Sequence, residues 1–232
     1  MPLLDKPTSA PRIDIDLVRE EALGCLRCPL STSRTQVVWA DGNLDSDVMF
    51  IGEAPGFHED KQGRPFVGAA GQLLDRLMGE IGLDRTSSAI VNVLKCRPPG
   101  NRDPHPDEIE SCTPYLHAQL AHMQPKVIVT LGNFATKFIL QSQVGITRAR
   151  GQRYMVRGSV VVPTFHPAAA LRGGRFGGIS PIDAIREDLN VVKAALDEAR
   201  AAESRAAEAR DVEQSESSQD LAASDTRQLG LF

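Results

Sequence analysis

The sequence predicts an α/β fold of three layers, in which helices cover both faces of a central four-stranded parallel sheet. Four short runs, at 48–51, 89–94, 126–131 and 160–165, have the near-continuous apolar character of strands that are buried on both faces. Amphipathic segments alternate with these runs, which is the pattern of parallel strands joined by helices. Ligands bind beyond the carboxyl ends of the strands in such sheets, so we expect the functional residues there.

Each predicted helix follows one of these strands. The first strand ends in a glycine turn at Gly52, and the next segment carries apolar residues at helical spacing, which are Leu73, Leu74, Leu77, Met78 and Ile81. A helix from about residue 106 to 123 follows the second strand, and residues 134–140 predict a helix after the third. Residues 152–158 predict a hairpin arm that leads into the fourth strand.

Composition indicates a globular body with an acidic tail. The chain has 232 residues, 41% hydrophobic and 24% charged, which is enough to bury one α/β core. No apolar run approaches the ~20 residues of a membrane span, so we expect no membrane contact. The residues from Leu196 onward hold nine of the 30 acids and four of the 26 bases, a net charge of −5. The first 195 residues therefore have a net charge of +1.

The sequence divides into four parts. Residues 1–20 contain three prolines and predict a loose arm or a short leading helix, and residues 21–195 predict the folded domain. Residues 196–227 predict a linker that begins as helix and is disordered from residue 211, where Ser, Gln, Asp and Glu replace apolar residues. Residues 228–232 are apolar at the tip of this polar tail, which predicts a peptide that binds a partner.

The four cysteines form two pairs with ligand-like spacing, Cys25-x2-Cys28 and Cys96-x15-Cys112. Thiolates are soft ligands, so four of them can close a tetrahedral zinc site or hold a four-iron cluster, and spacing alone does not choose between these. Buried free thiols would need no paired spacing, and a chain of this length needs no disulfide framework. The cysteines therefore predict a metal centre.

Polar motifs lie at the predicted carboxyl ends of the strands. They are Gly52-Glu53-Ala54-Pro55-Gly56 after the first strand, Asn92 in the second, and His166-Pro167-Ala168-Ala169-Ala170-Leu171-Arg172 after the fourth. A loop between the first two, Gly63-Arg64-Pro65-Phe66-Val67-Gly68, holds one aromatic residue between glycines. With the four cysteines, these motifs resemble family 4 of the uracil-DNA glycosylase superfamily, the iron–sulfur enzymes, over roughly residues 22–195.

The resemblance implies a DNA repair enzyme of base excision repair. Such an enzyme flips uracil out of single- or double-stranded DNA and hydrolyses its N-glycosidic bond to leave an abasic site. The resemblance also implies that Cys25, Cys28, Cys96 and Cys112 hold a [4Fe–4S] cluster, which leaves zinc as the minority interpretation. It further implies a cytoplasmic, nucleoid-associated monomer that needs no nucleotide cofactor.

The resemblance assigns catalysis to the first and last motifs. Gly52, Glu53 and Ala54 would lie against the uracil, and His166 would donate a hydrogen bond to the charge that develops on uracil O2. Glu53 would position water or steady the positive sugar, and Ala54 stands where the best-known branch of the superfamily has aspartate. A merely structural histidine is the alternative for His166.

Three further residues are assigned to the base. Phe66 would stack on the uracil, and the amide of Asn92 would read O4 and N3–H, a pattern that cytosine reverses. Glu59 would lie near the C5 edge, where bulk rejects the thymine methyl group. A core phenylalanine and a solvated carboxylate are the alternatives for Phe66 and Glu59. An asparagine in an apolar strand costs free energy without partners, which favours its functional interpretation.

Contacts with DNA are expected from four residues. Arg97 and Arg102, in the loop between the second pair of cysteines, would contact phosphates, and so would Arg172. Leu171 would enter the base stack as a wedge. Leu171 and Arg172 also suit an ordinary helix.

The last five residues resemble the bacterial sliding-clamp-binding peptide. Gln228, Leu229, Leu231 and Phe232 would enter a hydrophobic groove of the clamp. A tethered peptide of this kind raises the local concentration of the enzyme on DNA.

Two other classes of function stay open on the sequence. One is a tight or covalent uracil-DNA binder without turnover, but its relatives use a histidine in a long basic insertion, and His105 stands in a short Pro-rich segment instead. The other is an iron–sulfur DNA-binding scaffold, for which Phe66, Asn92 and His166 would have no explanation. The sequence also leaves open the activity on hypoxanthine or xanthine, the preference for single or double strands, and any redox role of the cluster.

Overall fold

The computed structural model describes residues 13–173 and 178–228, with side chains described up to Arg210. A six-stranded sheet has the order β1-β3-β2-β4-β6-β5. Its inner strands are β3 (Ala89–Asn92), β2 (Val48–Gly52), β4 (Val127–Leu131) and β6 (Ser159–Thr164), and each neighbouring pair among them is parallel. The predicted four-stranded parallel sheet is confirmed as the centre of this larger sheet.

Two short antiparallel strands extend the sheet at its edges. β5 (Tyr154–Val156) pairs with β6 and forms the arm predicted from residues 152–158. β1 (Asp41–Gly42) pairs with β3, and the sequence does not predict it, because two residues carry no periodic pattern.

Side chains of the inner strands alternate between two hydrophobic cores, one on each face of the sheet. In β2, Val48 and Phe50 belong to one core, whereas Met49 and Ile51 belong to the other. The first core is covered by α3 (Ala69–Glu80) and the start of α8 (Pro181–Gln228), and the second by α1 (Ile15–Leu23), α4 (Pro106–Met123) and α5 (Asn133–Leu140). The three layers are therefore as predicted.

Short helices occupy the connections. They are α2 (Phe57–Gln62), α6 (Ile146–Ala149) and α7 (Pro167–Leu171), with 3-10 turns η1 (Pro29–Thr32) and η2 (Pro99–Asn101). Helices α2 and α7 follow β2 and β6 directly, so both stand at the carboxyl edge of the sheet.

The helix α1 begins inside the predicted N-terminal arm. Asp14 caps it, because its Oδ1 accepts hydrogen bonds from the backbone N–H of Asp16 (3.1 Å) and Leu17 (3.2 Å). The helix contacts α4 and buries Ala22 in the second core. Of the two expectations for the arm, the described residues 13–20 thus form the short leading helix.

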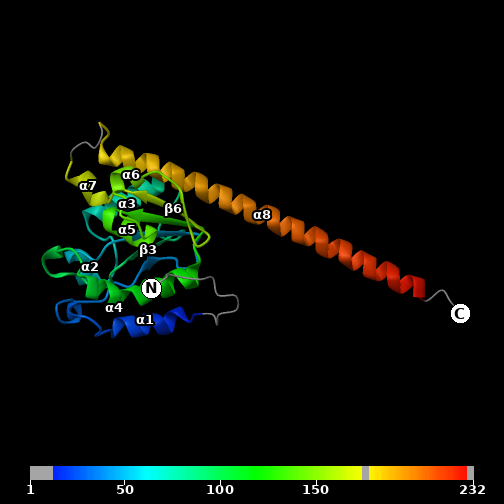
Figure 1. Cartoon of the computed structure of the whole chain (residues 1–232), viewed down its shortest axis with the longest axis horizontal. Coiled ribbons are helices and arrows are strands. Elements are labelled where there is room, and N and C mark those ends of the chain that lie inside the picture. The colour runs from blue at the N-terminus through cyan, green and yellow to red at the C-terminus, as the bar shows by residue number, and fades with distance from the viewer. Residues whose placement is uncertain (1–12, 174–177, 229–232) are drawn as a thin grey trace.

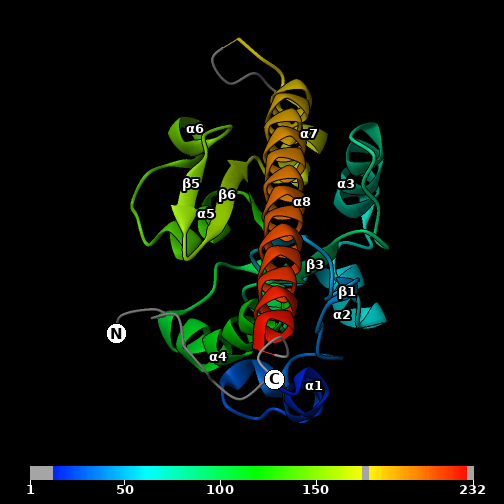
Figure 2. The same cartoon turned by 90° about the vertical axis from the view of Figure 1, so that its right-hand side faces the viewer.

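The helix α8 starts on the sheet and continues far beyond the body (Figure 1). Its first turns contact β6 and β4, and Figure 2 shows it crossing in front of the sheet, with α3 on one side and β5 on the other. Ion pairs of Arg153 with Glu198 (2.6 Å) and of Lys126 with Glu203 (2.5 Å) fasten its middle to the body.

The structure differs from the sequence prediction in residues 211–227, where disorder is predicted and α8 continues as helix to Gln228. This segment contains no glycine or proline, and its Ala, Gln, Glu and Arg residues have good helix propensity. Loss of apolar residues removed the signal for packing without removing the tendency to form helix. Leu229, Leu231 and Phe232 of the predicted clamp-binding peptide lie outside the described residues. Within the described ranges, no helix is long and apolar enough to cross a membrane.

Candidate functional site

A cleft of about 290 Å³ opens at the carboxyl ends of β2, β3 and β6. The predicted residues among those that line it are Glu53, Ala54, Glu59, Phe66, Asn92, Arg102 and His166. Parallel pairing places Gly52 beside Asn92, because these residues are partners in the register of β2 and β3. The fold thus brings together motifs that are more than 100 residues apart in the sequence.

Phe66 forms one wall of the cleft. Its ring lies against that of His166, with 5.4 Å between the centroids and 27° between the planes. Two glycines make room for it. A Cβ on Gly52 would lie 2.8 Å from the Phe66 ring, and a Cβ on Gly71 would lie 1.7 Å from the Phe66 carbonyl oxygen. Any side chain at either position would therefore displace the aromatic ring or its loop.

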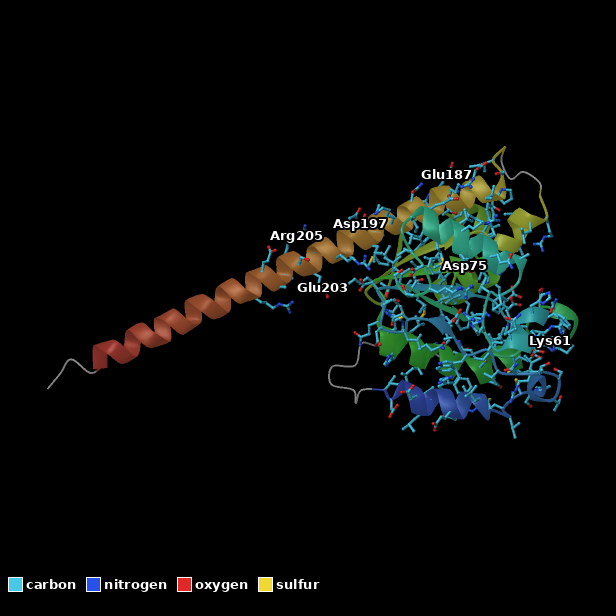
Figure 3. The ribbon with its side chains drawn as sticks, turned by 180° about the vertical axis from the view of Figure 1, so that it is seen from behind. Lys61, Asp75, Glu187, Asp197, Glu203 and Arg205 are labelled. Atoms are coloured by element: carbon cyan, nitrogen blue, oxygen red, sulfur yellow. The ribbon has the colours of Figure 1, made fainter. Side chains whose placement is uncertain are left out.

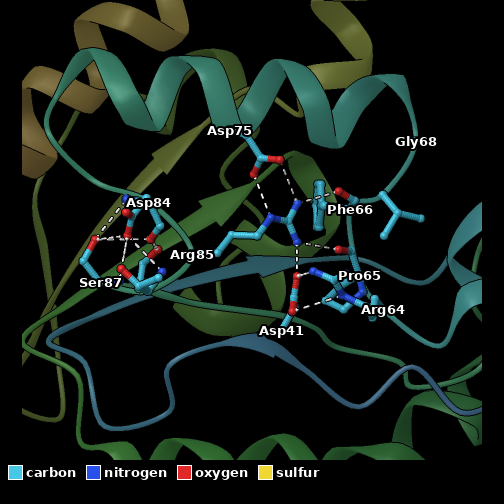
Figure 4. Close-up of polar contacts among 12 residues, drawn as sticks. Asp41, Arg64, Pro65, Phe66, Gly68, Asp75, Asp84, Arg85 and Ser87 are labelled. Atoms are coloured by element: carbon cyan, nitrogen blue, oxygen red, sulfur yellow. Dashed lines mark hydrogen bonds and ion pairs between the residues drawn. The ribbon is translucent and has the colours of Figure 1, made fainter.

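The backbone of Phe66 is itself strained, with a φ of +54° in the left-handed region. Arg85 holds it there (Figure 4). The Arg85 guanidinium donates to the carbonyl oxygens of Phe66 (2.6 Å) and Pro65 (3.1 Å). It also pairs with Asp41 and, at 2.9 Å, with Asp75. One side chain thereby joins β1, α3 and the Phe66 loop.

Arg85 has no feature in the sequence that marks it as part of the site. A cation between the predicted helix and the second strand has no local pattern, and its partners lie 10 to 44 residues away. The sequence offered only an indirect indication, which is that the carboxylates of Asp41 and Asp75 would each need a cationic partner if they were partly buried.

Glu59 supports the same loop from the opposite side. Its Oε1 accepts hydrogen bonds from the backbone N–H groups of Val67 and Gly68, each at 3.0 Å. The carboxylate is therefore neither freely solvated nor free to move. Glu59 lines the cleft, where the sequence predicted a residue near the base edge. It also orders the residues that follow Phe66.

Asn92 ends β3 with only 2% of its surface exposed. Its side-chain Oδ1 is fully buried without a hydrogen-bond partner in the described part of the chain. Its backbone carbonyl accepts from the buried Lys95 Nζ (2.7 Å), which also donates to Gln119 Oε1 (2.5 Å). A buried amide oxygen without a partner costs free energy, so a ligand that donates to it would be bound selectively.

His166 presents a neutral imidazole to the cleft. Its Nδ1 accepts from the backbone N–H of Ala168 (3.2 Å), so the proton of the neutral ring lies on Nε2. Burial, and then the nearby positive charge of Arg172, lower the pKa of His166 to about 4. The ring is therefore an uncharged hydrogen-bond donor at neutral pH.

Glu53 follows β2 and lines the cleft beside Ala54. Burial, reinforced by the negative charge of Asp103, raises the pKa of the Glu53 carboxyl above its usual value. A carboxyl group in this setting is suited to accept a proton or to face a positive centre.

The expected DNA contacts differ in their surroundings. Arg102 forms a double hydrogen bond with the buried Glu108 (2.5 and 2.9 Å), so it anchors its loop to α4 rather than presenting a free charge. Arg97 donates to Asn101 Oδ1 (2.7 Å) and is partly exposed. Leu171, which is 51% exposed, and Arg172 lie together at the end of α7, on the surface beyond His166.

The four cysteines line one second pocket. Cys25 and Cys28 follow α1, whereas Cys96 and Cys112 come from the end of the β3 segment and from α4. Cys112 Sγ accepts from the backbone N–H of Lys95 (3.1 Å), and Arg34 donates to Cys96 Sγ (3.4 Å). Burial outweighs the lowering effect of the Arg34 cation and raises the pKa of Cys96 to about 11.

A zinc ion and a four-iron cluster hold their cysteine sulfurs at different distances from one another. Four sulfurs around a zinc ion, each about 2.3 Å from it, lie only about 3.8 Å apart. In the described residues, no three His, Cys, Asp or Glu side chains are grouped so as to hold a single metal ion. A cluster in which each cysteine binds a different iron needs a wider set of ligands.

The cleft combines an aromatic wall, an unpartnered amide oxygen and a neutral N–H donor. This combination suits a planar heterocycle with both donors and acceptors on its edge, and the N–H donor suits negative charge that develops on it. A family model described as the uracil DNA glycosylase superfamily matches residues 39–190. The chain therefore belongs to this superfamily.

Curated relatives define the branch. The chain is 48% identical to a type-4 uracil-DNA glycosylase of Sulfurisphaera tokodaii over 68% of this chain and 76% of the relative. The identity is 42% to that of Saccharolobus solfataricus, over 79% and 87%, and 47% to that of Thermotoga maritima, over 68% and 83%. Within the superfamily, the chain belongs to the type-4 uracil-DNA glycosylases.

Replacing Arg85 is expected to loosen the Phe66 loop. Arg85→Gln removes charge-assisted hydrogen bonds to two carbonyl oxygens and two acids, and should lower the free energy of unfolding by about 1.5–3 kcal/mol in urea titrations. Amide hydrogen exchange at Val67 and Gly68 should accelerate at the same time.

Arg64→Gln is the matched control, since Arg64 pairs with the same Asp41 but is 59% exposed. It should cost less than about 1 kcal/mol and leave exchange in the loop unchanged. Equal effects of the two substitutions would contradict the role given to Arg85.

Proposed function

We propose that the chain excises uracil from DNA by hydrolysing the N-glycosidic bond, which leaves an abasic site. The observation that carries this proposal is the buried, unpartnered Oδ1 of Asn92 in the cleft beside Phe66 and His166. A ligand with an N–H group would give Asn92 Oδ1 the hydrogen-bond donor that it lacks. Uracil N3–H is such a donor. The type-4 uracil-DNA glycosylases named above support the same substrate.

Recognition follows from the chemistry of the amide. Asn92 Oδ1 accepts from uracil N3–H while its amide N–H₂ donates to O4. Cytosine offers an acceptor at N3 and a donor at the exocyclic amine, so the same amide would meet the reversed pattern. The base must leave the stack to reach a buried amide, and the Phe66 ring offers it a flat apolar surface in return.

Bond cleavage places negative charge on the leaving base and positive charge on the sugar. His166 Nε2–H, neutral and fixed by its contact with Ala168, donates to uracil O2 as the charge develops. Glu53 faces the same cleft and steadies the sugar or orients the attacking water. Because burial keeps the imidazole neutral, His166 donates this hydrogen bond without first taking up a proton from solvent.

The alternative of a covalently trapped binder is less well supported. His105, the only histidine in the short Pro-rich segment, caps α4 and does not line the cleft. The segment between Cys96 and Cys112 contains no other histidine in the sequence.

We infer further that Cys25, Cys28, Cys96 and Cys112 hold a [4Fe–4S] cluster. Four cysteines converge on one pocket, and the type-4 uracil-DNA glycosylases that the chain resembles support the iron–sulfur assignment over zinc. When bound, the cluster would tie α1 and α4 to the segment after β3. That segment carries Arg97 and lines the cleft through Pro98 and Asn101, so the cluster would fix one rim of the site.

Contacts with DNA and with a clamp complete the proposal. Arg97 and Arg172 are proposed to bind phosphates, and Leu171 to fill the space of the extruded base. Gln228, Leu229, Leu231 and Phe232 are proposed to bind a sliding clamp, supported by their sequence and by the distance of the α8 terminus from the body (Figure 1). The enzyme is proposed to act as a monomer, since both edge strands are only two or three residues long.

Excision is tested with a uracil-containing oligonucleotide followed by alkali, which cleaves the strand at an abasic site. The wild type should produce cleavage, and His166→Ala should lower kcat by about 10²–10³, the usual loss for one donor to a developing anion. Asn92→Ala should lose strand cleavage to a similar extent. His122→Ala, on α4 and away from the cleft, is the control. An adduct that survives denaturation, without cleavage, would establish the trapped binder instead.

Metal content is tested on protein purified without oxygen. The wild type should contain about four iron atoms and four acid-labile sulfides per chain, and Cys112→Ser should lose most of both. Ser111→Ala, the preceding residue of α4, lines the same pocket and should keep them. One zinc atom per chain would overturn the assignment.

Clamp binding is tested by removing residues 228–232. The truncated chain should lose affinity for a purified bacterial sliding clamp and keep its excision rate on short oligonucleotides. Unchanged affinity after truncation, or no binding by the whole chain, would rule out the clamp-binding role.

A further inference from the structure

An exposed aromatic ring stands beside the cleft and has no part in the chemistry above. Phe57 begins α2 directly after Gly56, which lines the cleft, and 45% of its surface is exposed. It is the one aromatic residue among the large exposed hydrophobic residues in the described ranges. Exposure of a phenylalanine leaves apolar surface in water that a ligand could cover.

Two cations accompany this ring. Lys61 Nζ lies 4.5 Å and Arg97 Cζ 5.1 Å from its centroid. Lys61 comes from the end of α2, and Figure 3 shows it at the surface on the side of the body away from the free end of α8. Arg97 comes from the segment after Cys96 and is held by Asn101, a residue of the cleft wall. The ring and its cations therefore border the cleft from two separate segments.

The acids of α2 do not cancel these charges at the surface. Asp60 is 4% exposed and accepts from the backbone N–H of Thr35 (2.9 Å). Glu59 is held by the loop amides after Phe66. Both carboxylates are held by backbone N–H groups, so the outer side of α2 presents Phe57, Lys61 and His58, whose ring lies edge-on to that of Phe57 with 5.4 Å between the centroids.

We propose that Phe57, Lys61 and Arg97 form a platform for an unpaired nucleobase of the DNA strand that carries the uracil. The inference rests on the proposed function, since the strand must run past the cleft. Both cations lie over the exposed ring, and their long side chains can turn to the phosphates of a strand while a base takes their place on the ring. A base exposes its face for such stacking only where it is unstacked. The platform therefore favours single-stranded substrates over duplexes.

The test compares kcat/KM for Phe57→Ala, Phe57→Leu and Phe57→Trp on a single-stranded oligonucleotide with purines beside the uracil. The alanine and leucine variants should lose roughly 5- to 150-fold, the range of base–aromatic stacking, and the tryptophan variant should keep the wild-type value. In a fully paired duplex the loss should shrink. Met155→Ala, a 70% exposed residue on β5, is the control.

A second substrate separates stacking from a merely structural effect. When abasic residues replace the bases beside the uracil, the wild type should fall to the level of Phe57→Ala, and the variant should lose nothing more. A loss in Phe57→Ala that is equal on both substrates, or no loss on either, would overturn the platform.

Failure of the proposed function would be visible separately, as no uracil release by the wild type from any substrate. In that case binding of a uracil-free strand containing 2-aminopurine decides the inference. A Kd raised at least fivefold by Phe57→Ala supports the platform, and an unchanged Kd overturns it.

Discussion

The guanidinium of Arg85 sets the shape of the base-binding cleft. Phe66 stands in a left-handed conformation that a phenylalanine does not choose by itself, and Arg85 compensates by binding its carbonyl oxygen. Burial works to raise the pKa of Asp41, but hydrogen bonds from Arg64 and Arg85 outweigh it and hold that pKa below its usual value. The edge strand β1 is only two residues long, but it carries the Asp41 carboxylate that binds Arg85.

The parallel sheet supplies the second constraint. Since Gly52 and Asn92 are register partners, a Cβ at position 52 would lie only 2.3 Å from Asn92 Oδ1. The absence of side chains at two glycines therefore shapes the cleft, as the contacts around it do. Glycine at 52 and 71 leaves the space in which the Phe66 ring and the Asn92 amide stand at their present angles.

The sequence predicted what local patterns encode, which are the inner strands, the helices between them and the motifs at the strand ends. It did not predict the interactions that depend on distant partners. Arg102 is predicted to contact phosphate, and the structure adds an ion pair with Glu108 at the start of α4 that the sequence did not indicate. Arg85 lies in no local pattern, because its acidic partners Asp75 and Asp41 are 10 and 44 residues away. The extent of α8 was missed for a different reason, since composition predicts burial better than it predicts helix.

The length of α8 has a geometric consequence. Among the side chains that the structure describes, up to Arg210, Glu203 forms the last ion pair of α8 with the body. The helix continues for 25 residues from there to Gln228, or about 37 Å at 1.5 Å per residue. A helix transmits direction as well as distance, so each residue inserted in this stretch turns everything beyond it by about 100° around the axis. A flexible tether would respond to insertions smoothly through its length. With a helical tether, the direction in which the end of the chain faces depends on the number of residues inserted. Seven added residues nearly restore the original direction, and two nearly reverse it.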